Sequence, residues 1–431
     1  MREADEPGAW LFARPTGGIR WGVERTEALL AGVDDPHRRF RSIHLGGTNG
    51  KGSTAALCES ALRAARPDRV VGMYTSPHLV SFAERIRIGG RPVERDLLLA
   101  CEARLRPAIE ASGATFFEAT TAIAFLCFAE AGVDTAVVEV GLGGRLDSTN
   151  VIAPIATAVT NIGIDHTEFL GSTPGEIAWE KAGIFKPGVV AVTAETAELP
   201  LGVLRRRAAE VGAPFHALGD LARVDDARVS LAGTEFLLRS RRWGERRVRV
   251  PLIGAHQAVN AALAAELLGL LPDGARPEWG AIEAGFAATR WPGRMQVLER
   301  GGLTWVLDVA HNQAGVESLA AALDGLPLPR PVILLAAILS DKEWGAMLPP
   351  LLARVDAAVL TVAPTAPESR RWDPEASAAA VEAPPGVAIR VIPDFAAAMR
   401  RVTTMAPYGA VLVTGSVHTV GDALAELGEE V

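Results

Sequence analysis

The sequence predicts a mixed α/β protein with two domains. Residues 1–290 are expected to form a P-loop domain with a doubly wound, mostly parallel sheet and a small antiparallel β portion, and residues 291–431 a smaller Rossmann-like α/β domain. Three observations predict this fold. Strand-like and helical segments alternate, the alternation starts again after residue 291, and polar motifs directly follow several strands. A chain of 431 residues can bury a large core in such domains.

The first series follows a helical segment at residues 10–31. Its predicted strands are residues 43–45, 70–74, 135–140, 155–164 and 188–193, with helices at 96–112 and 120–131. Ligands bind beyond the carboxyl ends of the strands in such sheets. Polar motifs stand there four times, at residues 46–53, 75–78, 139–147 and 165–166. This coincidence favours a nucleotide-binding enzyme.

Residues 227–251 have another pattern, in which apolar residues alternate with arginines. The alternation predicts antiparallel strands with a turn near Trp243 and Gly244. The arginines (239, 241, 242, 246, 247 and 249) could form an anion-binding patch, but a solvated hairpin face is the better explanation.

A second α/β series completes the chain after helices at 258–271 and 281–288. Trp291–Arg294 is interpreted as the hinge between the domains. The predicted strands of the second series are residues 303–307, 331–339, 357–362, 388–391 and 410–414. This part lacks the G-x-G-x-x-G fingerprint of dinucleotide-binding domains.

Composition excludes several classes of protein. The net charge of −8 argues against nonspecific nucleic-acid binding. The longest apolar run, Val332–Leu339, is too short to cross a membrane, and the acidic Met1–Pro7 has no apolar signal-like stretch. The three cysteines form no CxxC pair, which indicates reduced thiols and a cytoplasmic protein.

A glycine-rich turn links the strand Ile43–Leu45 to the next helix. Free backbone N–H groups at such a helix start bind phosphates, Lys51 can reach the outer phosphates, and Ser53 or Thr54 can face a metal ion. Leu45 and Gly52 depart from the strict P-loop pattern. The alternative explanation is an ordinary glycine-rich turn.

Three further side chains fit a magnesium–ATP site. Glu139 ends an apolar strand and would suit a cation there, although it could instead face water. His166 could be a ligand or a surface histidine. Lys181 lies in an apolar context that would suit a lysine with a shifted pKa or a modification. Only four of the 43 basic residues are lysines, at positions 51, 181, 186 and 342, so each could mark a place where arginine would not serve.

Together these motifs resemble the folylpolyglutamate synthase/dihydrofolate synthase branch of the Mur ligase family, from about residue 10 to 420. The motifs, in chain order, are Gly47–Ser53, Thr75–Leu79, Glu84–Arg87, Phe117–Glu118, Glu139–Asn150, Asp165–His166, Glu180–Lys186, His256–Gln257 with Asn260, Pro292–Arg294, Asp308–Asn312 and Gly415–Val420. The departures at Leu45 and Gly52 are also found in this branch.

The resemblance implies an ATP-dependent amide ligase. A folate carboxylate would take the γ-phosphate of ATP to give an acyl phosphate, and the amine of L-glutamate would then displace phosphate. It also implies Mg²⁺, a monomer, and a reduced folate or dihydropteroate as the acceptor. Another Mur-type ligase, acting on a cell-wall or amino-acid-polymer substrate, and a noncatalytic nucleotide-binding regulator are the alternatives.

The resemblance also implies roles for individual residues. ATP contacts fall on Asn49, Gly50, Lys51, Gly52, Ser53, Asn260, Arg294 and Asp308; metal ligands on Ser76, Glu139 and His166; catalytic roles on Lys51, Lys181 (carbamylated) and His311; and folate contacts on Thr115, Phe116, Phe117, Glu118, Leu146, Asp147 and Ser148.

Overall fold

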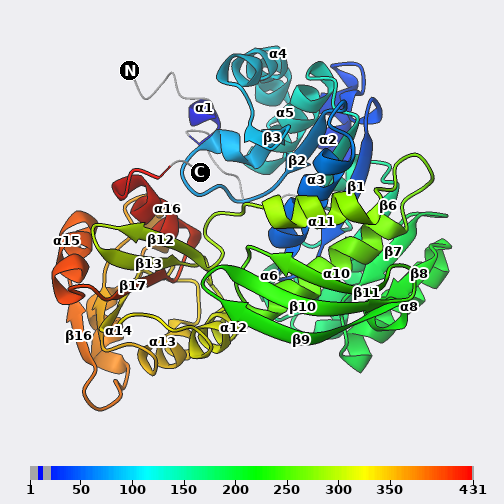
Figure 1. Ribbon diagram of the computed structural model, residues 1–431. Helices are drawn as coiled ribbons and strands as arrows, with labels where there is room; N and C mark the ends of the chain where they lie inside the picture. The colour runs from blue at the N-terminus through cyan, green and yellow to red at the C-terminus, as the bar shows by residue number, and fades with distance from the viewer. Residues whose placement is uncertain (1–7, 13–20, 430–431) are drawn as a thin grey trace.

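The structure of the chain is a computed structural model that describes residues 8–12 and 21–429. Two α/β units lie beside each other, the first drawn in blue to green and the second in yellow to red (Figure 1). Short helices α1 (Ala9–Phe12) and α2 (Glu24–Ala31) precede the first sheet. The helical prediction for residues 10–31 is tested only in part, because residues 13–20 and the acidic Met1–Pro7 lie outside the described residues.

The first unit is built on one eight-stranded sheet. In spatial order its strands are β4 (Arg91–Pro92), β3 (Ile86–Ile88), β2 (Val71–Tyr74), β5 (Thr135–Glu139), β1 (Arg41–Gly46), β6 (Ala156–Val159), β7 (Val190–Thr193) and β8 (Phe215–Ala217). The strands from β2 to β8 run parallel, whereas β3 and β4 pair antiparallel at one edge. The predicted doubly wound, mostly parallel sheet is confirmed.

Helices cover both faces of this sheet. On one side α3 (Lys51–Ala65) packs with α10 (Ala255–Gly269) and α11 (Trp279–Ala288). On the other lie α4 (Arg95–Ser112) and α5 (Phe116–Glu130). Strand β5 shows why both faces are apolar: Val137 packs into the first core and Val138 into the second. The remaining helices of this unit are α6 (Thr167–Leu170), α7 (Pro174–Lys181), α8 (Glu198–Val211) and α9 (Leu218–Leu221).

Four elements of the first unit, β3, β4, β8 and α5, differ from the sequence prediction. Strand β8 extends the series beyond residues 188–193, and the β3–β4 edge was not foreseen, because strands of two or three residues give no readable pattern. Helix α5 begins four residues before the predicted residue 120. The cause is a capping box, in which the Glu118 N–H donates to Thr115 Oγ1 and the Thr115 N–H donates to Glu118 Oε2.

A three-stranded antiparallel sheet follows, with β9 (Ala222–Ser230), β10 (Gly233–Ser240) and β11 (Gly244–Val250). Its arginines are paired across the strands: Arg247 and Arg249 both reach Glu235. The predicted antiparallel strands with a turn near Trp243 and Gly244 are confirmed, and the pairing of these arginines favours a solvated sheet face.

The second unit has a six-stranded sheet and is the smaller of the two. Its strands, in spatial order, are β12 (Gln296–Arg300), β13 (Leu303–Leu307), β17 (Ala410–Thr414), β14 (Val332–Ala336), β15 (Ala357–Leu360) and β16 (Ala388–Val391). Its helices are α12 (Gln313–Asp324), α13 (Trp344–Leu352), α14 (Pro374–Ala380), α15 (Phe395–Met405) and α16 (Val417–Glu426). Of these six strands, only β12, an antiparallel edge strand, is missing from the predicted strands of the second series.

The two units meet at the strand-end edge of the first sheet. Leu79, in the loop after β2, packs against the core of the second unit, and a Cβ on Gly421 in α16 would collide with the Leu79 carbonyl oxygen. Cys58, Cys101 and Cys127 are buried and free. No helix in the described part of the chain is long and apolar enough to span a membrane.

Candidate active site

The loop between β1 and α3 forms the floor of the site. Gly47 and Gly50 have φ values of 133° and 83°, which side chains rarely adopt. Gly50 also packs against the Asn260 side chain of α10, where a Cβ would lie 2.6 Å from Asn260 Oδ1. Gly52 lies under the Trp291 ring, 2.9 Å from the position of a Cβ. These contacts explain why glycine stands at positions 50 and 52.

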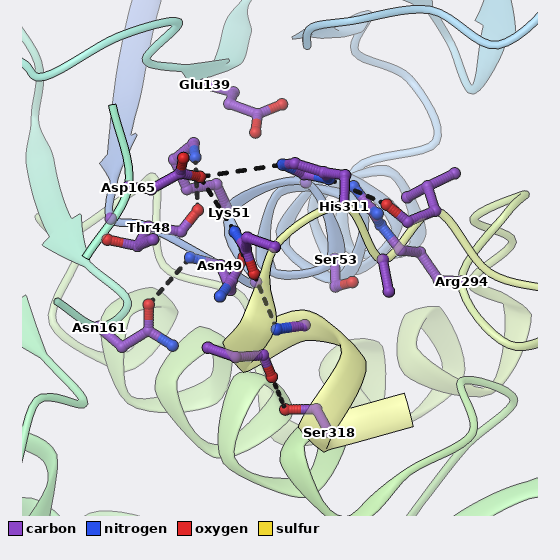
Figure 2. A pocket seen from close by; sticks show the side chains of 18 of the residues that line it. Thr48, Asn49, Lys51, Ser53, Glu139, Asn161, Asp165, Arg294, His311 and Ser318 are labelled. Atoms are coloured by element: carbon purple, nitrogen blue, oxygen red, sulfur yellow. Dashed lines mark hydrogen bonds and ion pairs between the residues drawn. The ribbon is translucent and has the colours of Figure 1, made fainter. Parts of the chain in front are cut away.

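The end of strand β6 holds this loop in place. The Thr48 N–H donates to the Asn161 carbonyl oxygen over 2.9 Å, and the Asn49 N–H donates to Asn161 Oδ1 over 2.9 Å. Thr160 Oγ1 donates to the Asn49 carbonyl oxygen over 2.6 Å. Figure 2 shows Asn161 beside Asn49. The loop is thus fixed before any ligand binds, as expected of a phosphate-binding turn.

Two lysines share the loop, Lys181 buried and Lys51 half-buried. Lys51 Nζ donates to the Thr48 carbonyl oxygen over 3.0 Å, and Lys181 Nζ donates to the Gly47 carbonyl oxygen over 2.9 Å. Burial lowers the pKa of both, and the nearby charge of Lys51 helps to bring the pKa of Lys181 to about 7. Near pH 7 a large fraction of the protein molecules therefore carry Lys181 as a neutral amine.

Glu139 lies across the cavity from the loop (Figure 2). Its side chain is buried, takes part in no ion pair among the described residues, and accepts one hydrogen bond, from the Ser76 N–H over 3.2 Å. Burial raises the pKa of its carboxyl group, opposed by the charges of Lys51 and Arg294. A buried carboxylate without a close cation fits the binding of a metal ion.

The second unit supplies the opposite wall. Asp308, at the end of β13, accepts hydrogen bonds from the Met295 and Ala310 N–H groups over 2.9 Å and 2.8 Å. His311 Nδ1 donates to the Val309 carbonyl oxygen over 2.9 Å, which leaves Nε2 as the free ring nitrogen. Burial lowers the pKa of His311 to about 4, so the ring is neutral and Nε2 can accept a proton.

Asp165 joins the two units. Its carboxylate accepts hydrogen bonds from Asn312 Nδ2 over 3.0 Å and from Lys342 Nζ over 3.2 Å, and its Oδ2 lies 3.9 Å from His311 Nε2. Burial works against ionisation, but the charges of His166 and Lys342 and the Asn312 hydrogen bond hold the pKa of Asp165 below its ordinary value. Two segments of the second unit are thereby attached to the end of β6.

All predicted ATP-binding, metal and catalytic residues line a single cavity of about 270 Å³. They are Asn49, Gly50, Lys51, Gly52, Ser53, Ser76, Glu139, His166, Lys181, Asn260, Arg294, Asp308 and His311. Among the described residues no cluster of three or more His, Cys, Asp or Glu side chains could hold a metal ion alone.

A second, more apolar cavity of about 580 Å³ adjoins the first. Ser76, Pro77, Gly141 and Leu142 line both. Six of the predicted folate contacts line the second cavity: Thr115, Phe116, Phe117, Leu146, Asp147 and Ser148.

Glu118 does not belong to this wall. It is buried, with one carboxylate oxygen in the α5 capping box and the other 2.8 Å from Arg25. The Asp147 carboxylate also serves the chain itself, since it accepts the Leu142 and Thr149 N–H groups over 2.8 Å and 3.0 Å. Both carboxylates thus hold the surrounding chain in place, and the predicted folate contacts of Glu118 and Asp147 remain predictions.

Sequence reasoning assigned no role to several lining residues. Trp21, Arg85 and Phe169 line the apolar cavity, and Asp165, His256, Gln257, Asn312 and Ser318 line the polar one. Trp21 and Phe169 face each other with ring centroids 6.4 Å apart, and each is 40% exposed. One signal could have identified Phe169 from the sequence: it is an aromatic residue directly after the polar run Asp165–Glu168.

The fold and the site define a class of enzyme. A phosphate-binding loop on a doubly wound sheet, closed by a second α/β unit that carries an acid and a neutral histidine, is the arrangement of an ATP-dependent ligase. Residues 45–268 match the Mur ligase middle domain, and residues 293–417 match the Mur ligase glutamate ligase domain. The chain belongs to the Mur ligase family.

Within that family it belongs to the folylpolyglutamate synthase/dihydrofolate synthase branch. The dihydrofolate synthase/folylpolyglutamate synthase of Bacillus subtilis (strain 168) is 38% identical over 79% of this chain and 80% of its own length. The folylpolyglutamate synthase of Mycobacterium tuberculosis, complexed with ADP and AMPPCP, matches with a TM-score of 0.86 and 32% identity over 98% of this chain and 97% of that one. E. coli FolC in complex with DHPP and ADP matches with a TM-score of 0.85 and 29% identity over 99% of both chains.

Proposed function

We propose that this protein joins L-glutamate to a carboxylate of a reduced folate, and of dihydropteroate, in a reaction driven by ATP. The observation that carries the proposal is the pair of adjoining cavities, one polar and built for phosphates, one aromatic and large enough for a flat ring system. The four residues shared by both cavities would let an acceptor lie in the aromatic cavity with its reacting carboxylate at the phosphate. No feature favours a cell-wall or amino-acid-polymer substrate.

In the first step the acceptor carboxylate attacks the γ-phosphorus of ATP, and ADP leaves. The loop amides from Asn49 to Ser53 and the Lys51 ammonium would bind the phosphates and stabilise the charge that moves onto them. Arg294 and Asp308 would contact the nucleotide from the second unit. Asn260, which packs against Gly50, would hold the loop and the nucleotide together.

Mg²⁺ would be held by Glu139 and Ser76, with His166 near a second ion, and would neutralise charge on the phosphate oxygens. Lys181 would carry a carbamate, formed when its neutral amine adds CO₂ and loses a proton. The low pKa of Lys181 supports this proposal, because only the neutral amine is a nucleophile. A carbamate would give Lys181, which lies beside Lys51, a negative charge, and its oxygens could coordinate a metal ion.

In the second step the amine of glutamate attacks the acyl phosphate, and phosphate leaves. His311 Nε2 is a neutral acceptor at the cavity wall and could take the proton that the amine loses. The contacts of Asn312 and Lys342 with Asp165 would keep the second unit closed and water away from the acyl phosphate.

The working units in this proposal are residues 1–290 and 291–431, hinged at Trp291–Arg294. We also propose that the protein acts as a monomer in the cytoplasm, since both cavities are complete within one chain and all three cysteines are free.

The test is a turnover assay with purified protein, Mg²⁺, ATP and L-glutamate. Tetrahydrofolate and dihydropteroate are offered separately, and phosphate release and product mass are measured. The expected product is heavier by one glutamyl residue, with one phosphate released for each amide formed. No reaction with either acceptor would overturn the proposed function.

A further inference from the structure

Arg85 is a buried cation in the wall of the aromatic cavity. Its side chain, just before β3, is only 7% exposed, and it lines the same cavity as Phe116 and Asp147. It forms no ion pair among the described residues, and its guanidinium makes one hydrogen bond, from Nε to His78 Nδ1 over 2.7 Å. A buried guanidinium without a carboxylate partner is costly, so its presence calls for an anion that the chain does not supply.

The two terminal nitrogens of Arg85 are available to a ligand. Neither makes a hydrogen bond within the described residues, and neither is among the fully enclosed polar atoms without a partner. Each therefore keeps some exposed surface, and Arg85 as a residue lines the aromatic cavity. A guanidinium held through Nε, with its two terminal N–H groups free, has the geometry that binds a carboxylate through two parallel hydrogen bonds.

A second positive feature lies beside it. The guanidinium carbon of Arg85 is 5.2 Å from the ring centroid of Phe116, the first residue of helix α5, and Phe116 and Phe117 line the cavity too. The first amides of a fifteen-residue helix carry partial positive charge. No acid forms an ion pair with Arg85 among the described residues: Glu118 is paired with Arg25, Glu84 and Asp147 accept the chain's own N–H groups, and the charges of Glu84 and Glu139 act on Arg85 without direct contact.

We propose that Arg85 and the start of α5 bind a carboxylate of the acceptor that does not react. This inference rests on the proposed function and adds a determinant of its specificity. With its reacting carboxylate in the polar cavity, a glutamylated folate still has an α-carboxylate to place, and dihydropteroate has none. Arg85 thus favours acceptors that already carry glutamate.

The matched probes are two acceptors that differ in this one group. Tetrahydrofolate carries glutamate, and its analogue with 4-aminobutyrate in place of glutamate keeps the reacting carboxylate and lacks the α-carboxylate. Arg85→Ala should lower kcat/KM for tetrahydrofolate by about 10- to 100-fold and that for the analogue or dihydropteroate by less than about threefold. Arg85→Lys should recover part of the loss, since lysine keeps the positive charge but cannot form the two parallel hydrogen bonds of a guanidinium.

Arg87→Ala is the matched control. Arg87 stands two residues after Arg85, within β3, and its guanidinium carbon lies over Trp291, 5.8 Å from the ring centroid, outside the aromatic cavity. Its loss should affect all acceptors by the same factor. Wild-type protein gives an independent reading that needs no variant, because it should bind tetrahydrofolate at least tenfold more tightly than the 4-aminobutyrate analogue.

Equal losses with all acceptors in Arg85→Ala, or equal binding of tetrahydrofolate and the analogue to wild-type protein, would overturn the inference. The Arg85–His78 hydrogen bond would then be a purely structural contact. Neither result would touch the proposed function. Absence of turnover by wild-type protein with every pteroyl acceptor would overturn the proposed function, and this inference with it.

Discussion

The polar and the aromatic cavity meet at Ser76 and Leu142, but they are built in different ways. The polar cavity consists of loops at strand ends, held by backbone hydrogen bonds such as those from Thr48 and Asn49 to Asn161. The aromatic cavity is formed by ring side chains from separate segments, with Arg85 as its buried cation. The first arrangement fixes where charge is stabilised, and the second leaves room to select a substrate. Changes in the polar cavity should therefore slow all acceptors alike, and changes in the aromatic cavity should act on acceptor binding.

The largest expected effect in the polar cavity is that of Lys181→Ala. It should lower kcat by about 10³-fold with every acceptor, since one preorganised charged group is removed from the phosphoryl-transfer site. Short carboxylic acids should restore part of the activity by taking the place of the carbamate. Lys186→Ala is the control, because Lys186 donates to the Asn150 carbonyl oxygen outside both cavities and its loss should leave kcat unchanged. Full activity of Lys181→Ala without additive would contradict the carbamate proposal.

Lys181 also predicts a pH dependence. Since its pKa is lowered to about 7, the amine is neutral above this pH and protonated below it, and only the neutral form adds CO₂. Protein freed of CO₂ should regain activity faster at pH 8 than at pH 6 when the same concentration of dissolved CO₂ is supplied. Recovery at equal rates would count against a carbamate on this residue.

The next largest effect is expected at the hinge. Arg294 lies half-buried near the charges of Asp308 and Glu139, and Arg294→Ala should lower kcat/KM for ATP by about 10²-fold, whichever acceptor is used. The exposed Arg290 provides the control, and Arg290→Ala should behave as wild type. If Arg294→Ala turned over normally, closure about Trp291–Arg294 would not be needed to complete the site.

The smallest effect should come from the aromatic wall. Phe169→Ala removes the ring that faces Trp21 and should raise KM for the acceptor about five- to tenfold, with kcat and the KM for ATP nearly unchanged. Leu199→Ala, an exposed apolar residue on α8 outside this cavity, is the control. A fall in kcat at constant acceptor KM would mean that Phe169 affects the chemical step. It would contradict the claim that the aromatic cavity acts only on acceptor binding.

The same division explains what the sequence could predict. Glycines at 47, 50 and 52, Lys51 and Glu139 stand at strand ends, and a parallel sheet brings strand ends together. Lys181 ends helix α7 and was singled out by its apolar sequence context. The structure places them in one cavity. Their roles as ATP, metal and catalytic groups remain predictions. Short edge strands such as β3 and β8 were not predicted, because they contain too few residues to show an alternating pattern.

The aromatic cavity was harder to predict. Phe116 and Phe117 were named only through the resemblance, since an aromatic pair at a helix start resembles core. The sequence analysis assigned no role to Arg85. Its proposed role follows from its burial without an ion-pair partner, which only the three-dimensional structure reveals. Glu118, predicted as a folate contact, does not line the cavity, and its pairing with Arg25 is a long-range contact that the sequence does not reveal; its folate contact remains a prediction.

The central claim is that the two cavities together activate an acceptor carboxylate by phosphorylation. The most direct test uses tetrahydrofolate labelled with ¹⁸O in its reacting γ-carboxylate, with ATP, Mg²⁺ and L-glutamate, and mass analysis of the released phosphate. The account predicts one ¹⁸O atom transferred to phosphate for each amide formed, because the carboxylate oxygen bridges to phosphorus in the acyl phosphate. Unlabelled phosphate alongside normal amide formation would contradict it.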